Sequence, residues 1–105
     1  MTTRTIAGRQ LDLTEDGFLE RTDQWTPEVG VAIAKEVGID PLTERHWQVV
    51  DFMRSTYLES GSAPSIRTLG KVSGVPVKEL YQLFPKGPAK LAARIAGIPK
   101  PRGCI

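Results

Sequence analysis

The sequence contains almost none of the residues that build disulfides and metal centres. It has one cysteine, Cys104, and one histidine, His46, among 105 residues. A single cysteine excludes an intramolecular disulfide, so the fold depends on its hydrophobic core. Structural zinc sites use about four ligands, mostly cysteine and histidine. The sequence therefore predicts no metal site.

Long apolar segments are missing as well. No run approaches the roughly 18 to 20 apolar residues that a membrane-spanning helix needs. Residues 1–4 lack the apolar stretch and the cleavage site of a signal peptide. The content of 40% hydrophobic and 25% charged residues is that of an ordinary globular chain. We therefore expect a cytoplasmic protein that does not contact a membrane.

The known catalytic motifs are absent too. The sequence has no recognisable Ser/His/Asp set, motif of paired carboxylates or phosphate-binding loop. His46 lies beside a predicted apolar stripe with no second catalytic group linked to it, which favours a structural or merely exposed histidine. We expect no independent catalytic site and no cofactor.

Charge is distributed unevenly along the chain. Residues 1–59 carry eleven acids and six bases, a balance of −5, whereas residues 60–105 carry eight bases and one acid, a balance of +7. A basic half favours an anionic partner, either nucleic acid or an acidic protein face. A basic surface that is simply solvated is the alternative.

Start and stop signals predict five helices after a short hairpin around Gly8. The first two are bounded by Thr26 and Gly38 and by Thr43 and Gly61. Three shorter helices are predicted over residues 65–74, 76–85 and 88–97. In the second helix, the spacing leaves open whether Met53 or Arg54 lies on the buried face.

These elements predict a mainly α fold, an orthogonal bundle of about five helices with a small N-terminal β-hairpin, a helix-turn-helix-like element and a flexible C-terminal arm. The apolar stripes predict the following buried residues: Trp25, Ile33, Trp47, Val50, Leu69, Leu80, Phe84 and Ile95.

The predicted arm is the distinct part of the chain. Pro99 and Pro101 prevent a helix, so we assign residues 1–97 to a globular domain and residues 98–105 to a mobile arm. Eight extended residues reach on the order of 25 Å. The arm holds the only thiol, Cys104, and the neighbouring Gly103 lets a partner's backbone approach closely. Lys100 and Arg102 favour the thiolate, which is the nucleophile, while the terminal carboxylate opposes it.

Several segments of the sequence resemble the DsrC/TusE family. The C-terminal run carries the resemblance most specifically, with LFPKGPAK at residues 83–90, IAGIPKP at residues 95–101 and GCI at residues 103–105. Earlier segments agree with it: DGFL at 16–19, Trp25, RHWQVV at 45–50 and APSIR at 63–67. The resemblance covers nearly the whole chain.

The resemblance implies a sulfur carrier that holds persulfide sulfur on its penultimate cysteine, here Cys104. It implies a sulfurtransferase-like role with partner enzymes, in tRNA thiolation or in sulfur oxidation associated with sulfite reductase. The implied donor is DsrEFH-like or TusBCD-like, and the implied acceptor is a thiouridylase or is sulfite reductase-like. We expect partner binding by six residues: Lys100, Arg102, Gly103, Lys86, Lys90 and Arg94.

One position departs from part of that family. Members that work with dissimilatory sulfite reductase have a second cysteine eleven positions before the penultimate one, and this chain has Ala93 there. TusE-like members also lack the second thiol. The departure therefore favours simple relay through one thiol.

A second interpretation rests on residues 65–85, which are similar to a helix-turn-helix of the TetR kind. Four lysines are available for phosphates: Lys71, Lys78, Lys86 and Lys90. The recognition helix would have only Gln82 to read bases. Sequence-specific DNA binding is one alternative function, and a regulatory or docking subunit without sulfur transfer is another.

Overall fold

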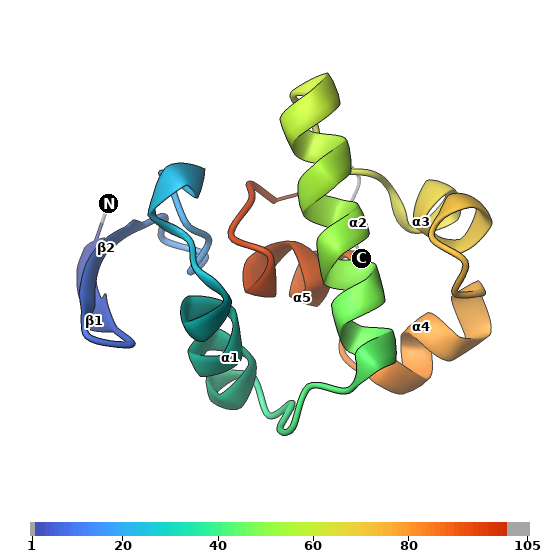
Figure 1. Cartoon of the computed structure of the whole chain (residues 1–105), viewed down its shortest axis with the longest axis horizontal. Coiled ribbons are helices and arrows are strands. Elements are labelled where there is room, and N and C mark those ends of the chain that lie inside the picture. The colour runs from blue at the N-terminus through green and yellow to red at the C-terminus, as the bar shows by residue number, and fades with distance from the viewer. Residues whose placement is uncertain (1, 101–105) are drawn as a thin grey trace.

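The computed structural model describes residues 2–100, and it is mainly helical (Figure 1). The elements in chain order are β1 (Thr2–Ile6), β2 (Arg9–Leu13), the 3-10 helix η1 (Thr22–Gln24), α1 (Pro27–Glu36), α2 (Glu44–Ser60), α3 (Ile66–Val72), α4 (Val77–Leu83) and α5 (Pro88–Ile95). The prediction of five helices preceded by a hairpin is confirmed. No helix described within residues 2–100 is long and apolar enough to cross a membrane.

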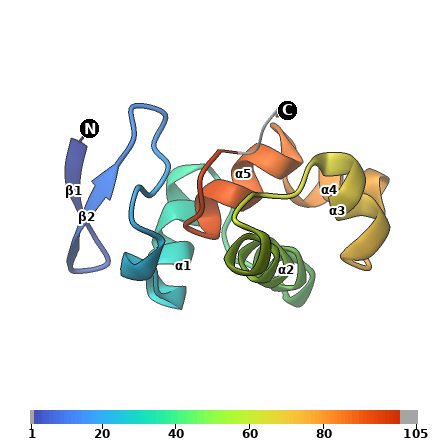
Figure 2. The ribbon, with the colours of Figure 1, turned by 90° about the horizontal axis from the view of Figure 1, so that it is seen from above.

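Helix α5 lies in the middle of the molecule and contacts the other four helices (Figure 1). The hairpin and α1 lie on one side of it, and α3 and α4 lie together on the other, as the perpendicular view also shows (Figure 2). The last described residues therefore leave from the centre of the bundle, because they follow α5 directly.

The hairpin is closed by the two residues Ala7 and Gly8. Both have positive φ, 52° and 78°, as a type I′ turn requires. This turn matches the right-handed twist of paired strands, and β1 and β2 are antiparallel with Ile6 opposite Arg9. Gly8 therefore lies in the hairpin turn that the sequence predicts there.

Three predicted N-caps form as expected. The hydroxyl of Thr26 accepts a hydrogen bond from the N–H of Val29 at the start of α1. Thr43 caps α2 and Ser65 caps α3 in the same way, each through the N–H three residues later. These bonds satisfy N–H groups that have no partner inside the helix.

Two helices end in the same way, although they are far apart in the sequence. After α1, Gly38 has φ 88°, and the N–H of Ile39 donates to the carbonyl of Ala34 at 2.8 Å. After α5, Gly97 has φ 70°, and the N–H of Ile98 donates to the carbonyl of Ala93 at 3.1 Å. Both ends are Schellman motifs, in which a glycine adopts the left-handed conformation and the next residue packs inward.

Six of the eight predicted core residues are buried: Ile33, Val50, Leu69, Leu80, Phe84 and Ile95. Trp25 and Trp47 are only partly buried at the edge of the core, so this part of the prediction is wrong. Indole rings are large and carry a polar N–H, which makes full burial uncommon. In Trp25 that N–H is used for a specific hydrogen bond, described below.

The buried core extends one residue beyond the predicted domain boundary. Ile98, assigned from the sequence to the arm, is fully buried, whereas Pro99 and Lys100 are exposed. The Schellman motif explains this difference, because it turns the chain back so that the residue after the glycine meets the core. The arm therefore begins no earlier than Pro99. Residues 101–105 lie outside the described residues, and their mobility stays a prediction.

An ion pair joins α2 to α4. Arg45 donates from Nε and Nη2 to the two carboxylate oxygens of Glu79, at 2.7 and 2.6 Å. These hydrogen bonds lower the pKa of Glu79 below its usual range and raise the pKa of Arg45. Because the folded state lowers the pKa of an acid, the pair adds stability above roughly pH 4.5, and this contribution is lost as the pH falls through the depressed pKa.

We therefore expect the melting temperature of the wild type to fall more between about pH 5 and pH 3 than that of Glu79→Gln, with the two approaching each other at the acid end. Both side chains of the pair are partly exposed, so the difference should be small and should shrink in high salt. Glu59→Gln is the control, because Glu59 makes no ion pair with the residues that the structure describes. Equal acid sensitivity in the wild type and Glu79→Gln would contradict the prediction.

Candidate functional site

The start of the predicted arm is fixed by two side chains that lie far before it in the sequence. The indole Nε1–H of Trp25 donates to the carbonyl of Ile95 at 2.8 Å. Nη1 of Arg54, in α2, donates to the carbonyl of Ala96 at 2.9 Å. Carbonyls at a helix C-terminus lack partners within the helix. Trp25 and Arg54 supply those partners at the end of α5.

Arg54 also makes contacts away from α5. It donates to the hydroxyl of Thr22 at 2.9 Å, and its guanidinium lies 4.3 Å from the centre of the Trp25 ring. Burial lowers the pKa of Arg54 from its ordinary value, although an arginine stays charged at any physiological pH. A partly desolvated cation over an indole is a strong form of the cation–π interaction. Trp25 and Arg54, called the arm anchor below, thus connect η1, α2 and α5.

Glycine at two positions lets the indole fit against the backbone. A Cβ on Gly97 would lie 2.4 Å from Cδ1 of Trp25, and a Cβ on Gly30 would lie 3.2 Å from the same ring. Real Cβ atoms do not approach as closely as the first of these distances. The Trp25 ring therefore covers the turn at Gly97, where α5 ends and the chain turns back toward Ile98.

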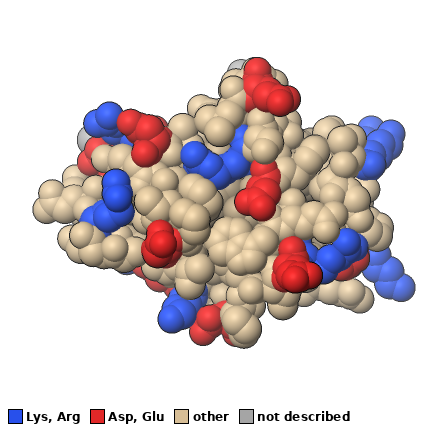
Figure 3. All heavy atoms as spheres, viewed as in Figure 1, with Lys and Arg blue, Asp and Glu red and all other residues tan. Residues whose placement is uncertain are grey.

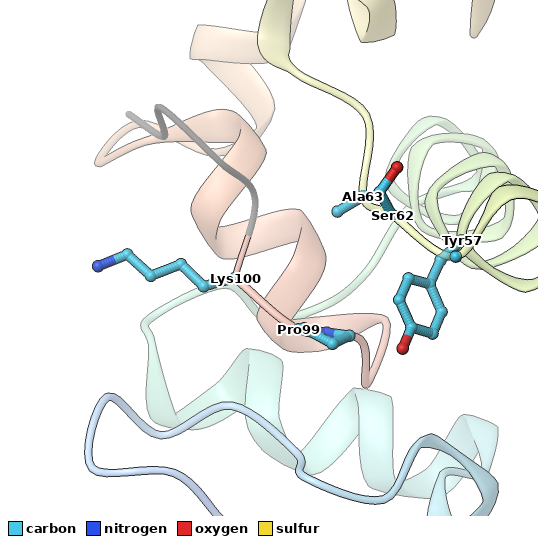
Figure 4. A pocket seen from close by; sticks show the side chains of 6 residues that line it. Tyr57, Ser62, Ala63, Pro99 and Lys100 are labelled. Carbon is cyan, nitrogen blue, oxygen red and sulfur yellow. The ribbon is translucent and has the colours of Figure 1, made fainter.

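A surface cavity of about 260 Å³ lies beside this exit. It is lined by Tyr57, residues 61–63, Pro99 and Lys100 (Figure 4). The ring of Pro99 faces the side of Tyr57, whereas the side chain of Lys100 points away from both Tyr57 and Ala63 (Figure 4). Among the described residues that line this cavity there is no cysteine, histidine or carboxylate.

Two of the predicted binding residues meet at the loop after β2. Nζ of Lys100 lies 3.7 Å from a carboxylate oxygen of Asp16. Nε of Arg94 donates to the carbonyl of Gly17 at 3.2 Å. These contacts place the positive charges of Lys100 and Arg94 on one side of the exit.

Lys86 and Lys90 lie at the other end of α5. Lys86 is exposed in the turn before this helix, and Lys90 is half-buried in its first turn. The eight residues of α5 span roughly 12 Å. Lys90 and Arg94 are four positions apart and therefore lie one turn apart on the same side of α5, whereas Lys86 precedes the helix.

Three predicted site residues, Arg102, Gly103 and Cys104, lie outside the described residues. Ala93, where part of the family has a second cysteine, is fully buried in α5. Its carbonyl accepts the hydrogen bond from Ile98 that forms the Schellman motif. Position 93 is therefore part of the core.

His46 has a structural role. Its Nδ1 accepts from the backbone N–H of Thr43 at 3.0 Å, and its Nε2 lies 3.0 Å from the carbonyl of Leu83. A carbonyl only accepts, so Nε2 carries the proton. The ring also meets Phe84 edge to face, with centroids 5.2 Å apart. His46 thus joins the start of α2 to the end of α4. Within residues 2–100, no three His, Cys, Asp or Glu side chains are grouped to hold a metal ion.

Comparison with known proteins extends over the whole chain. A family model described as "DsrC like protein" matches residues 5–105. The gamma subunit of dissimilatory-type sulfite reductase from Nitratidesulfovibrio vulgaris is 42% identical over 101 residues, which cover 96% of each chain. Sulfurtransferase TusE from Salmonella typhimurium is 45% identical over 105 residues, covering 93% of this chain and 95% of the relative.

A solved structure resembles this chain over nearly its whole length. The NMR structure of DsrC from Allochromatium vinosum has a TM-score of 0.83 and 42% identity, and the match covers 98% of this chain and 97% of that one. The likeness thus includes the hairpin, the five helices and the turn that leads out of α5.

Proposed function

The chain belongs to the DsrC-like family, and from that membership we propose that it is a sulfur carrier that holds transferable sulfur as a persulfide on Cys104. The observation that carries the proposal is the extent of the family match, which runs from residue 5 to residue 105 and so includes Cys104. Cys104 is also the only thiol in the chain. Persulfide formation needs a thiol, so no other residue can take this role.

Two thiolate exchanges account for the relay. The Cys104 thiolate attacks the outer sulfur of a donor persulfide, forms a new S–S bond and releases the donor's thiolate. Cys104 then carries the outer sulfur, and a thiolate of the acceptor attacks that sulfur in turn. The second attack returns the Cys104 thiolate and leaves the persulfide on the acceptor. Neither exchange changes the overall oxidation state, so no cofactor is needed.

The described residues support this proposal by their geometry. The arm anchor and the buried Ile98 hold the chain firmly up to the point where it becomes exposed at Pro99. Beyond that point, we propose that residues 99–105 form an arm that presents Cys104 to other proteins. Lys100 and Arg94 lie beside the exit and are suited to an acidic partner.

The relatives' names point to partners of two kinds. One relative is named as a subunit of sulfite reductase and the other as a sulfurtransferase. We propose a persulfide donor protein and an acceptor enzyme as partners, the acceptor being sulfite reductase-like or a tRNA-thiolating enzyme. Ala93 favours relay through one thiol over a bridge between two thiols. An unpaired thiol also suits the reducing cytoplasm.

The alternative functions receive less support. Neither reported relative is named as a DNA-binding protein, and the exposed face of α4 offers only Lys78 and Gln82 for reading bases. A docking subunit without sulfur transfer would share the fold but not the chemistry of Cys104.

Intact-mass spectrometry tests the proposal directly. We expect the protein, after incubation with a cysteine desulfurase and cysteine, to gain the mass of one sulfur atom, which dithiothreitol then removes. Fragmentation should place the sulfur on Cys104. A protein that stays unmodified, while a known persulfide carrier in the same mixture is loaded, would contradict a carrier role.

A further inference from the structure

Exposed apolar side chains gather in the two short helices α3 and α4. Four large apolar residues are exposed among those that the structure describes, and three of them, Val72, Val77 and Tyr81, lie in α3 or α4. Val77 and Tyr81 are 39% and 42% exposed and lie one turn apart on α4, so they share one side of the helix. A soluble protein that exposes neighbouring apolar side chains at one place often binds another molecule there.

Helix α3 extends this surface with positive charge. A Cβ on Gly70 would lie 2.4 Å from Cγ2 of Val77, so α3 and α4 approach each other very closely at this point. Arg67 lies one turn before Gly70, and Lys71 follows it, and both are exposed. Lys78 is exposed next to Val77 on α4. We define the α3–α4 face by Arg67, Lys71, Val77, Lys78 and Tyr81.

The α3–α4 face carries no acid of its own. Glu79 is the only acid in residues 60–105, and it is held by Arg45 of α2, at 2.6 Å. Basic side chains accordingly project from the α3–α4 end of the molecule (Figure 3). The face therefore has a small apolar centre bordered by three cations.

We propose that the α3–α4 face docks onto an acidic protein surface with an apolar recess that receives Tyr81, and that this surface belongs to the enzyme that accepts the sulfur. The inference rests on the proposed function, because it names the docking site of the same carrier. Tyrosine is a frequent hot spot at the centre of interfaces, and charges at the border steer association. Phosphates would satisfy the cations but would leave Val77 without an apolar partner, which favours a protein over DNA.

Site-specific crosslinking in the source cells identifies the partner. A photoreactive benzoylphenylalanine replaces Gln82, which is exposed beside Tyr81. In a control strain it replaces Arg9, the exposed first residue of β2, and β2 lies at the opposite end of the molecule from α3 and α4 (Figure 1). We expect one protein to be captured through position 82 and not through position 9, and we expect this protein, once purified, to take sulfur from loaded Cys104; a captured protein that takes none would overturn the proposal. Capture of nucleic acid, capture of a second copy of this chain, or equal capture at both positions would overturn the proposal.

Binding of the captured protein, purified, then tests the chemistry of the face. We expect Tyr81→Ala, and the double variant Lys71→Glu with Lys78→Glu, each to raise the dissociation constant at least about 10-fold. The charge variant should also flatten the dependence of binding on salt. The control is Arg9→Glu with Lys35→Glu, which changes the net charge equally at exposed positions elsewhere and should stay within about 2-fold. Equal effects of the two double variants would refute docking at this face.

Two readouts separate this inference from the proposed function. Cys104→Ser should bind the captured protein as tightly as the wild type does, because the docking residues lie elsewhere. The Lys71→Glu, Lys78→Glu variant should take up sulfur from inorganic polysulfide at the wild-type rate. If polysulfide fails to load the wild type, the carrier function fails while the docking result stands. Circular dichroism melts confirm that each variant is folded.

Discussion

Cys104→Ser is expected to reduce both sulfur loading and sulfur delivery to background while leaving the melting temperature unchanged. A hydroxyl cannot form a persulfide, and the chain has no other thiol to replace the lost one. The fold should survive, because every buried residue of the described core precedes Pro99. Loading is measured as the gain of one sulfur by intact mass, and delivery as sulfur appearing on a verified acceptor.

A thiol moved to another position is the sharper control. In the variant Cys104→Ser with Ser62→Cys, the thiol lies at an exposed position in the lining of the cavity beside the exit. We expect polysulfide to load this thiol, but we expect no delivery to the acceptor enzyme, because position 62 is fixed to the body. Equal delivery by the wild type and by Cys104→Ser would refute the carrier function and leave the docking-subunit alternative.

Gly97→Ala is expected to lower the free energy of unfolding by about 3 kcal/mol, against about 1 kcal/mol for Gly38→Ala. Both glycines occupy the same place in a Schellman motif, so both variants incur the strain of a left-handed alanine. Only at position 97 would the new methyl group collide with a ring, that of Trp25. A Cβ on Gly38 would have no heavy atom within 4 Å apart from its own chain neighbours. Urea unfolding measures both differences.

Removing the indole ring of Trp25 tests whether the collision with this ring causes the larger destabilisation by Gly97→Ala. In a Trp25→Ala background, the additional cost of Gly97→Ala should disappear, so that the two glycine variants become equally destabilising. A difference that persists without the indole would show that the close approach of Trp25 is not its source.

Most helix boundaries could be predicted because the signals are local. Thr26, Thr43 and Ser65 cap the helices that they were expected to cap, and Gly61 ends α2 in the left-handed conformation. In each case the preference comes from residues within one turn. The positions of these helix ends can therefore be predicted from the sequence alone.

The arm anchor could not be predicted, because it joins residues that are far apart in the sequence. The apolar stripes place Trp25 in the core, but its hydrogen bond to Ile95 spans seventy positions of the sequence. The spacing left Met53 and Arg54 as alternatives for the buried face, and both point inward, Met53 fully buried and Arg54 partly. The sequence did contain one sign of the arm anchor, because Arg54 falls on a predicted apolar stripe. A cation that is partly buried needs hydrogen-bonding partners, and this indicates that Arg54 contacts polar groups.

The burial of Ile98 sets the length of the arm. From Lys100, the last described residue, the Cα of Cys104 is four residues away, a span of at most roughly 14 Å, compared with the 25 Å that a free segment of eight residues would reach. The reach of the proposed arm is therefore counted from a fixed point just after α5. Each residue inserted between Lys100 and Cys104 would extend that reach by at most roughly 3.4 Å. With an arm of this length, we expect no delivery to an acceptor whose thiol lies much deeper than this below its own surface, however tightly the two proteins bind.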